Sequence, residues 1–271
     1  MADKISKPPA SALPEVDRQF ATTLARGLGI LRCFTSAEPA LGNKEISTRT
    51  RLPKATISRL TYTLTKLGYL RQEKQSRKYQ LGPAAVTFAY PVLASLRIRQ
   101  IARKLMQSLA DYSGGAVAMG MCDRLSMVYI EVGRQFNAVA ELPDVDSSFA
   151  ICDSSAGWSA LSGLGAARRD DIVNRIKIDQ PKLYALHSGD IDAGLESIRS
   201  LGYCISRFQL AEGITTVSAP LHGLVQGEVI TFSCALADAS IRKGWLEQDI
   251  GPRLVTMAHN VEDLYQADAP A

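Results

Sequence analysis

The chain of 271 residues is 46% hydrophobic and 21% charged, with a formal net charge of +4. This composition is typical of a soluble globular protein and excludes collagen-like and low-complexity chains. Neither a run of about 18 apolar residues nor the apolar core of a signal peptide occurs, so we expect a cytoplasmic protein without a membrane partner. The five cysteines are widely spread and form no C-x-x-C pair, which argues against a disulfide framework or a zinc site.

The charges separate the chain into two parts. Residues 17–82 contain 13 Lys and Arg against 4 Asp and Glu, whereas residues 83–271 contain 16 against 21. A basic segment followed by an acidic one is typical of a DNA-contacting domain joined to a domain with a different task.

Residues 1–15, rich in Pro, Ala and Ser, are expected to form a flexible arm. A first domain is predicted over residues 16–82. It begins with an amphipathic helix over residues 17–34, for which Asp17 is a suitable cap. The predicted inner face of that helix is formed by Phe20, Leu24, Leu28, Leu31 and Phe34.

The next two predicted helices form a helix-turn-helix. Asn43 can cap a short helix that ends near Thr50, and Pro53 suits the first turn of a second helix that ends before Gly68. The apolar face of the second helix is formed by Ile57, Leu60, Leu64 and Leu67. Its other face is polar and basic, as expected of a helix that enters the major groove of DNA.

A basic hairpin follows the helix-turn-helix. Residues 69–70 and 79–81 are predicted to pair around the loop EKQSRK, as the wing of a winged helix that contacts phosphates or the minor groove. The predicted DNA contacts are Lys54, Ala55, Thr56, Ser58, Arg59, Tyr62, Thr63, Arg77 and Lys78. Because basic amphipathic helices also occur in proteins that bind no nucleic acid, a sensor that acts through protein partners is the alternative.

Residues 83–97 are expected to form a linker helix, kinked or ended near Pro91, which packs either on a sister chain or on its own domain. A further helix is expected over 98–112. Beyond it, strands are expected at 116–123, 127–133, 137–142, 203–206, 215–221 and 229–236, and helices at 155–164, 166–177, 191–200 and 240–265. This alternation fits a five- or six-stranded sheet covered by helices, in a domain over 98–265 that is followed by a tail, 266–271.

Four blocks of the sequence resemble the IclR family of bacterial transcriptional regulators. They are RLPKATISRLTYTLTKLGYL, YQLGP, CDSSAGWSAL at 152–161 and GYCISRFQLAEGITTVSAPL at 202–221, in the family's order and spacing. The resemblance implies an α+β two-domain protein with an N-terminal winged helix-turn-helix, a linker helix and a C-terminal GAF-like α/β sensor domain. It also implies control of transcription through double-stranded operator DNA, a small-molecule effector, and a homodimer or a homotetramer built as a dimer of dimers.

The resemblance further implies where the effector binds. Carried over position by position, the family's contacts fall on Ser154, Ser155, Ala156, Ser206, Thr216 and Cys234. A helix that starts near Ser155 offers free N–H groups and a partial positive charge, so we expect a carboxylate effector. Candidates for an apolar wall, each of which can equally be core, are Met119, Met121 and Leu236.

The chain also departs from the family pattern. Cys152 stands where many members have His, and SRFQLAEG replaces an acidic cluster, so we expect neither a metal nor a cofactor. Arg207 is available to bind an anion there, and Trp158 to shrink or fill the pocket. A cysteine-dependent enzyme built on Cys152 and Asp153 is a weaker alternative, because the sequence supplies no base and the three histidines form no triad or metal-ligand pattern. We therefore expect a protein that is not an enzyme.

Overall fold

The computed structural model describes residues 19–135, 144–145, 147–207 and 212–268. Within these ranges the chain forms two compact units, one that ends at Ser95 and one that begins at Leu96. The predicted arm over 1–15 and the predicted cap Asp17 lie outside the described residues.

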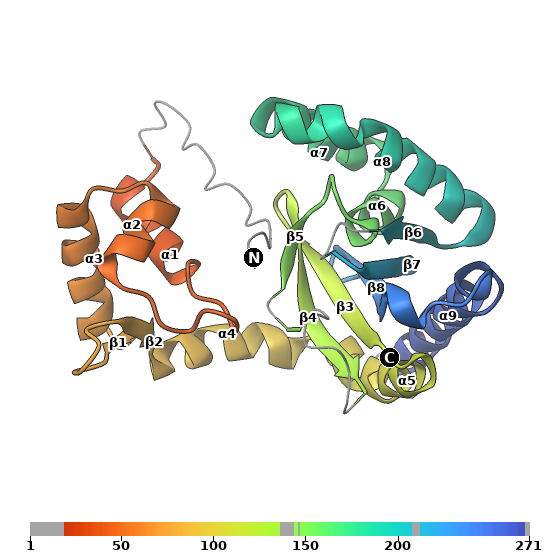
Figure 1. The fold of residues 1–271 in the computed structure, drawn as a ribbon, viewed down its shortest axis with the longest axis horizontal. Coiled ribbons are helices and arrows are strands. Elements are labelled where there is room, and N and C mark those ends of the chain that lie inside the picture. The colour runs from red at the N-terminus through yellow and green to blue at the C-terminus, as the bar shows by residue number, and fades with distance from the viewer. Residues whose placement is uncertain (1–18, 136–143, 146, 208–211, 269–271) are drawn as a thin grey trace. The chain divides into compact units, whose positions relative to one another are not determined.

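The N-terminal unit is a three-helix core followed by a two-stranded wing and one long helix (Figure 1). Its elements are α1 (Thr22–Leu31), α2 (Asn43–Thr50), α3 (Lys54–Lys66), β1 (Leu70–Gln72), β2 (Tyr79–Leu81) and α4 (Pro83–Ser95). The strands pair antiparallel, from Leu70 opposite Leu81 to Gln72 opposite Tyr79. The core of the unit consists of Ile30, Cys33, Phe34, Leu41, Ile46, Ile57, Leu60, Leu64 and Leu70.

Backbone chemistry fixes the ends of α2 and α3. Arg51 has a φ of 57°, which ends α2, and Gly68 has a φ of 78° just beyond α3, where a side chain would be strained. The Gly42 N–H donates to Glu45 Oε2 at 2.7 Å, so the N-cap of α2 is Gly42 rather than the predicted Asn43.

The predicted inner face of the first helix is correct at Leu31 and Phe34, which pack in the core, and wrong at Phe20, Leu24 and Leu28. Leu24 and Leu28 are 63% and 45% exposed, whereas Gly27 and Ile30 are buried. Leu67, predicted to close the apolar face of α3, is 60% exposed as well. Apolar residues occur on more than one side of these helices, so their spacing alone did not decide which side packs inward.

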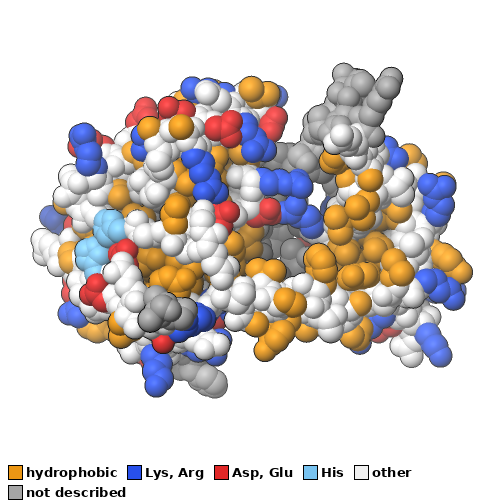
Figure 2. All heavy atoms as spheres, turned by 180° about the vertical axis from the view of Figure 1, so that it is seen from behind, with side chains coloured by type: hydrophobic (Ala, Val, Ile, Leu, Met, Phe, Trp, Pro, Cys, Tyr) orange, Lys and Arg blue, Asp and Glu red, His pale blue; other side chains and the backbone are white. Residues whose placement is uncertain are grey.

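Of the two predicted alternatives, a kink or an end near Pro91, the end does not occur, because the linker helix α4 runs through Pro91 to Ser95. It has no buried residue, and Phe88 and Tyr90 are 68% and 65% exposed. Within the unit, Phe88 touches the Tyr69 ring edge-on at 6.3 Å between ring centroids. Figure 2 shows hydrophobic side chains gathered over the surface of this unit on the face seen from behind.

The C-terminal unit is a six-stranded antiparallel sheet with helices on both faces. The strand order is β5-β4-β3-β8-β7-β6, with α6, α7 and α8 on one face and α5 and α9 on the other (Figure 1). The strands are β3 (Ala116–Asp123), β4 (Ser126–Arg134), β5 (Ser148–Ala150), β6 (Cys204–Arg207), β7 (Ile214–Val225) and β8 (Glu228–Ala237). The helices are α5 (Arg97–Ser113), α6 (Ser155–Ser162), α7 (Ala166–Asp179), α8 (Pro181–Leu201) and α9 (Gly251–Ala267).

Two helices of this unit differ from the prediction. Helix α8 starts at Pro181, ten residues before the expected start at 191. The expected last helix is divided into η1 (Asp238–Ser240), the π-helix η2 (Leu246–Ile250) and α9. The short strand β5 was not predicted, and the strand predicted at 137–142 lies outside the described residues.

Candidate DNA-binding surface and effector site

The outward side of α3 carries the predicted DNA contacts. Lys54, Ala55, Ser58, Arg59, Tyr62 and Thr63 are exposed and Thr56 is half-buried. The inward side is fixed by packing and by the buried Thr61 hydroxyl, which donates to the Ile57 carbonyl at 2.9 Å. Asn43 Nδ2 donates to Ser58 Oγ at 3.3 Å, so Ser58 also ties α3 to the start of α2. The remaining exposed contacts, Arg59 above all, are free to face a groove.

The wing separates its two predicted cations. Arg77 lies at the tip with a φ of 60° and is exposed. Lys78 instead turns toward α2, where its Nζ lies 3.5 Å from Glu45 Oε1. The Gly42 N–H, and next to it Lys78, hold the pKa of the Glu45 carboxyl below its usual value. Part of the Lys78 charge is therefore balanced within the protein, whereas that of Arg77 is available to a phosphate.

A hollow of about 510 Å³ lies between the wing and the start of α2. It is lined by Gly42, Asn43, Lys44, Glu45, Gln72, Ser76, Arg77, Lys78 and Tyr79. Lys44 was not predicted as a contact, because only the folded hairpin brings the tip of the wing beside it. The only signal in the sequence was its place in the first turn of α2, where backbone N–H groups also point outward.

In the C-terminal unit, the predicted effector residues at the start of α6 are buried against the sheet. Ser154 caps α6, because its Oγ accepts from the Gly157 N–H at 3.1 Å and donates to the Ala150 carbonyl at 2.8 Å. Ala156 is buried. The Ser155 hydroxyl donates to the Thr216 carbonyl at 3.5 Å. Ser154, Ser155 and Ala156 therefore lie together at the start of α6. Ser154, however, has a structural role as the helix cap, which the sequence alone did not reveal.

Four buried serines form what we call the hydroxyl cluster: Ser155, Ser206, Ser218 and Ser233. The Ser206 hydroxyl donates to Ser155 Oγ at 2.9 Å, and Ser155 and Ser218 share a hydrogen bond of 2.9 Å. Ser218 and Ser233 continue the chain at 2.8 Å. The cluster joins α6 to β6, β7 and β8. Ser218 and Ser233, which the sequence did not single out, occupy paired positions of β7 and β8.

Three further hydroxyls on this side of the sheet are buried without a hydrogen-bond partner among the described residues: Tyr129, Ser159 and Thr231. Tyr129 and Thr231 flank Gly120, since a Cβ built there would meet the Tyr129 ring at 3.1 Å and Thr231 Oγ1 at 3.2 Å. Burial raises the pKa of Tyr129 to about 12, although the nearby Ser233 hydroxyl lowers it in part, so the Tyr129 hydroxyl is a donor at neutral pH. A buried hydroxyl without a partner costs about 1–3 kcal/mol, which a bound ligand or water recovers.

The predicted apolar wall lies on the wrong face of the sheet. Side chains alternate along a strand, and Cys234 is one residue beyond Ser233. Its Sγ is 3.7 Å from Ser113 Oγ of α5. Leu236 shares the Cys234 face. Met119 and Met121, opposite Phe232 and Ile230 in the register, share it too. A single pocket against α6 therefore cannot include Cys234, Met119, Met121 and Leu236.

Arg207 is displaced from the effector site for the same reason. It pairs with Thr215 in the β6–β7 register, one residue out of phase with Ser206 and Thr216. The Arg207 side chain therefore points to the face opposite α6, and its predicted role beside Ser206 was wrong.

Two family profiles match the chain. The IclR helix-turn-helix domain matches residues 23–74, and the C-terminal domain of bacterial IclR transcriptional regulators matches residues 90–262. The chain belongs to the IclR family. It is a transcriptional regulator with a DNA-binding helix-turn-helix, which confirms the family and the two-part architecture that the sequence predicted.

Several IclR-family proteins align over nearly the whole chain. The crystal structure of an IclR family transcriptional regulator from Brucella abortus is 39% identical over 97% of this chain and 100% of that one, with a TM-score of 0.78. The HTH-type transcriptional regulator TsaQ1/TsaQ2 of Comamonas testosteroni is 29% identical over 100% of this chain and 97% of its own. An IclR homolog from Microbacterium hydrocarbonoxydans, crystallised with 4-hydroxybenzoate, is 19% identical over 91% of this chain and 100% of that one, with a TM-score of 0.67. At that identity the last likeness shows the fold.

Burial lowers the reactivity of the Cys152 thiol. Burial first, and then Asp153 and Asp190, raise the pKa of the Cys152 thiol to about 11. At neutral pH the group is a protonated thiol and a poor nucleophile. Of the histidines, His222 and His259 meet at 2.9 Å between their Nε2 atoms, but no group of three metal-ligating side chains occurs within the described ranges.

A helix must be both long and apolar to cross a membrane. Among the helices that the structure describes, none combines the length and the apolar character needed to cross a bilayer.

Proposed function

We propose that this IclR-family protein binds operator DNA as a homo-oligomer through α3 and the wing, and that a small carboxylate bound between α6 and the sheet controls that binding. One observation carries the effector half of the proposal: three buried, unpartnered hydroxyls lie on the same side of the sheet as the hydroxyl cluster. An effector that favours one arrangement of the protein changes DNA occupancy by its difference in affinity for the two arrangements, typically about 1–3 kcal/mol.

The exposed side of α3 supports the DNA half of the proposal. Arg59 projects from the side of the helix opposite Ile57 and Leu60, and no ion pair holds it within the described residues. A guanidinium in that position can donate two hydrogen bonds to the O6 and N7 atoms of guanine. Arg77 at the wing tip is placed for a phosphate, which contributes affinity but no sequence preference.

Replacing Arg59 with alanine is expected to cost about 1–3 kcal/mol on the operator and to relax the preference for one base pair, because a direct base contact is lost. Fluorescence anisotropy with the intergenic DNA beside the gene measures the effect, at two salt concentrations and against a scrambled duplex. The same titration gives the number of chains bound at each site.

Arg77→Ala is the matched comparison within the same surface. It removes one phosphate contact, so we expect equal weakening on operator and scrambled DNA and a salt slope that is smaller by about one. Equal losses on both duplexes for Arg59→Ala would contradict the base-reading role. Failure of the wild-type protein to bind any duplex would instead favour the sensor that acts through protein partners.

Exposed apolar residues support a homo-oligomer. In α1, Leu24 and Leu28 face outward, and in α4, Val86, Phe88 and Tyr90 are each about two-thirds exposed. Apolar area of this kind on a DNA-binding unit is stabilised when a second copy covers it. A pair of recognition helices then reads two half-sites, one helical turn or a multiple of it apart.

The chemistry around the hydroxyls favours an aromatic acid among small carboxylates. The Tyr129 ring packs on Phe149 with centroids 5.2 Å apart, and Trp158 is buried in the same core. The start of α6 supplies backbone N–H groups and a partial positive charge for a carboxylate. The relative from Microbacterium hydrocarbonoxydans was crystallised with 4-hydroxybenzoate, a ligand that carries a carboxylate at one end of an aromatic ring and a phenolic hydroxyl at the other.

Tyr129→Phe is expected to stabilise the unliganded protein by about 1 kcal/mol, because it removes a buried hydroxyl that has no partner. The same change should weaken 4-hydroxybenzoate binding, because the lost hydroxyl is a proposed ligand contact. Thermal unfolding with and without 4-hydroxybenzoate, together with calorimetric titration, measures both effects.

Tyr203→Phe provides the control. The Tyr203 hydroxyl donates to the Glu247 carbonyl at 3.0 Å, so its removal should destabilise the protein and leave 4-hydroxybenzoate binding unchanged. If Tyr129→Phe destabilised the protein as Tyr203→Phe does, the Tyr129 hydroxyl would have a partner of its own and the effector site would lose its main support.

A further inference from the structure

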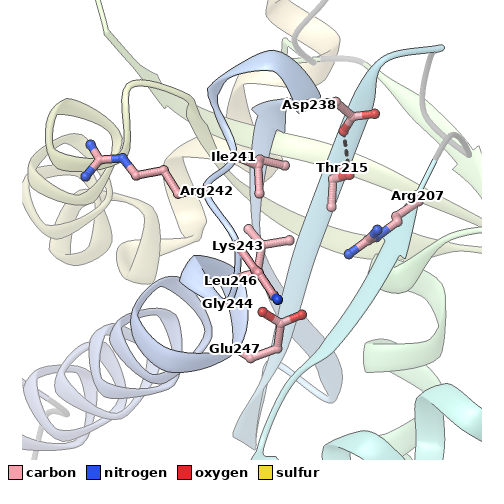
Figure 3. A pocket seen from close by; sticks show the side chains of 9 residues that line it. All are labelled: Arg207, Thr215, Asp238, Ile241, Arg242, Lys243, Gly244, Leu246 and Glu247. Atoms are coloured by element: carbon pink, nitrogen blue, oxygen red, sulfur yellow. Dashed lines mark hydrogen bonds between the residues drawn. The ribbon is translucent and has the colours of Figure 1, made fainter.

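A second hollow, of about 470 Å³, lies on the face of the sheet opposite α6. It opens between the ends of β6 and β7 and the segment that connects β8 to α9 (Figure 3). Its lining residues are Arg207, Thr215, Asp238, Ile241, Arg242, Lys243, Gly244, Leu246 and Glu247. The sheet itself separates this hollow from the hydroxyl cluster.

Hydrogen bonds hold the walls of this second hollow in place. The Thr215 hydroxyl donates to Asp238 Oδ1 at 2.6 Å, which fixes the end of β8 against β7. Gly244, with a φ of 73°, turns the chain into the π-helix η2. The Tyr203 hydroxyl donates to the Glu247 carbonyl and ties η2 to the start of β6. A π-helical turn is rare and is frequently found at functional sites.

Two cations point into this space from different elements. Figure 3 shows the Arg207 guanidinium and the Lys243 ammonium directed into the hollow, with the Glu247 carboxylate facing them. Arg242, although next in sequence to Lys243, turns away and lies over the Trp245 ring at 5.6 Å. In the part of the chain that the structure describes, no carboxylate oxygen lies within 4.0 Å of a side-chain nitrogen of Arg207 or Lys243, so neither residue forms an ion pair.

The charges of the lining set the class of ligand. Arg207 and Lys243 match a carboxylate, for which a guanidinium offers paired donors and an ammonium a point charge. Glu247 and Asp238 lie on the walls of the same space, so a purely anionic molecule would meet like charge there. A molecule with a carboxylate at one end and an ammonium at the other can pair its carboxylate with the two cations and its ammonium with Glu247.

We propose that this hollow is a second small-molecule site, for an amphoteric ligand such as a short amino acid. Its carboxylate binds Arg207 and Lys243, and its ammonium group binds Glu247. The volume lies within the range of about 300–1,000 Å³ that is usual for small-molecule sites. The site is independent of the effector site against α6, and it gives Arg207 an anion-binding role on the other face of the sheet.

Three probes of equal carbon number test the ligand class: 4-aminobutyrate, butyrate and butylammonium. Calorimetric or NMR titration of the full-length protein should show binding of 4-aminobutyrate, and binding of butyrate and of butylammonium weaker by about ten-fold or more, because each lacks one charge-assisted contact. Equal binding of butyrate would overturn the amphoteric class. Absence of 4-aminobutyrate binding would overturn the site.

Substitutions in the lining of the hollow then test whether 4-aminobutyrate binds there. Arg207→Gln and Lys243→Gln should each weaken 4-aminobutyrate binding about ten-fold or more, whereas Arg175→Gln, at an exposed position of α7 outside the hollow, should leave its affinity unchanged. Thermal unfolding of the three variants checks that each is folded. Unchanged affinity in Arg207→Gln would refute the assignment. The effector proposal is tested separately, because Tyr129→Phe should not alter 4-aminobutyrate binding and 4-hydroxybenzoate should not compete with it.

Discussion

Replacing Gly157 with alanine is expected to lower the free energy of unfolding of the C-terminal unit by about 3 kcal/mol, at the upper end of overpacking costs. Gly157 lies in the first turn of α6, directly against the backbone of Ile151. A Cβ added there would lie 2.2 Å from the Ile151 carbonyl oxygen and 2.4 Å from its Cα. These are backbone atoms, and the Ile151 N–H donates to the Leu125 carbonyl at 3.0 Å. Neither the backbone of Ile151 nor that of α6 can therefore move without a cost in free energy.

The clash has a functional consequence, because α6 must move away from the sheet to relieve it. The hydrogen bond that Ser206 donates to Ser155 and the one that Ser155 shares with Ser218, each 2.9 Å, are the first contacts that such a movement stretches. We therefore expect Gly157→Ala to lose 4-hydroxybenzoate binding under conditions where the protein is still folded. Urea unfolding and calorimetric titration of the same preparation separate the two effects.

Gly189→Ala is the control within the same unit. Gly189 is an exposed interior residue of α8, and a Cβ there meets nothing within 4 Å. Alanine at such a position should raise the free energy of unfolding by about 0.5–1 kcal/mol, since glycine is a poor helix former. If Gly157→Ala proved as harmless as Gly189→Ala, the close packing of α6 on Ile151 would be wrong.

The parts of the fold that could be predicted are those whose signals are local. The turn at Arg51, the boundary at Gly68 and the extent of α3 follow from backbone chemistry that any fold would share. The inward side of α1 could not be predicted, because it depends on the packing of α2 and α3 around Ile30. The early start of α8 at Pro181 was missed for a similar reason, since its first turns are only partly buried: Leu183 and Tyr184 pack against the core, whereas Leu186 is 73% exposed.

The candidate site depended on the phase of each strand, which the sequence does not reveal. Ser206 and Arg207 are neighbours in the chain, yet one joins the hydroxyl cluster and the other lines the second hollow on the opposite face. Ser233 and Cys234 are divided in the same way. A resemblance that transfers positions one by one cannot distinguish such neighbours, because a shift of one residue reverses the face.

A β-bulge in β4 has a comparable effect on Tyr129 and Glu131. Tyr129 and Glu131 are two residues apart, so in a regular strand their side chains would point to the same face of the sheet. The register between β3 and β4 shifts at Met119 and Gly120, which places Met119 opposite Glu131 and Gly120 opposite Tyr129, with Ile130 as the extra residue. Tyr129 consequently faces α6, while Glu131 reaches the first turns of α5.

Glu131→Gln is expected to lower the free energy of unfolding by about 3 kcal/mol, because it removes the buried carboxylate that Arg99 and Arg103 share. Glu131 accepts from Arg99 at 2.6 Å and from Arg103 Nε at 3.0 Å, and its side chain and that of Arg99 are only 10% and 16% exposed. Glutamine has nearly the same volume, so the change tests the charge and its hydrogen bonds rather than packing. Urea unfolding of the variant at neutral pH gives the value.

Arg103→Gln distinguishes the buried pair from the exposed one. Arg103 is 63% exposed, and the loss of a solvent-exposed ion pair should cost less than about 1 kcal/mol. If Glu131→Gln lowered the free energy of unfolding as little as Arg103→Gln does, water would reach Arg99, and the bulge would not bury the pair of Arg99 and Glu131. A large cost for Glu131→Gln alone would identify this pair as the contact that holds the start of α5 to β4. Because α5 directly follows α4 in the chain, the same contact would then fix where the linker leaves the C-terminal unit.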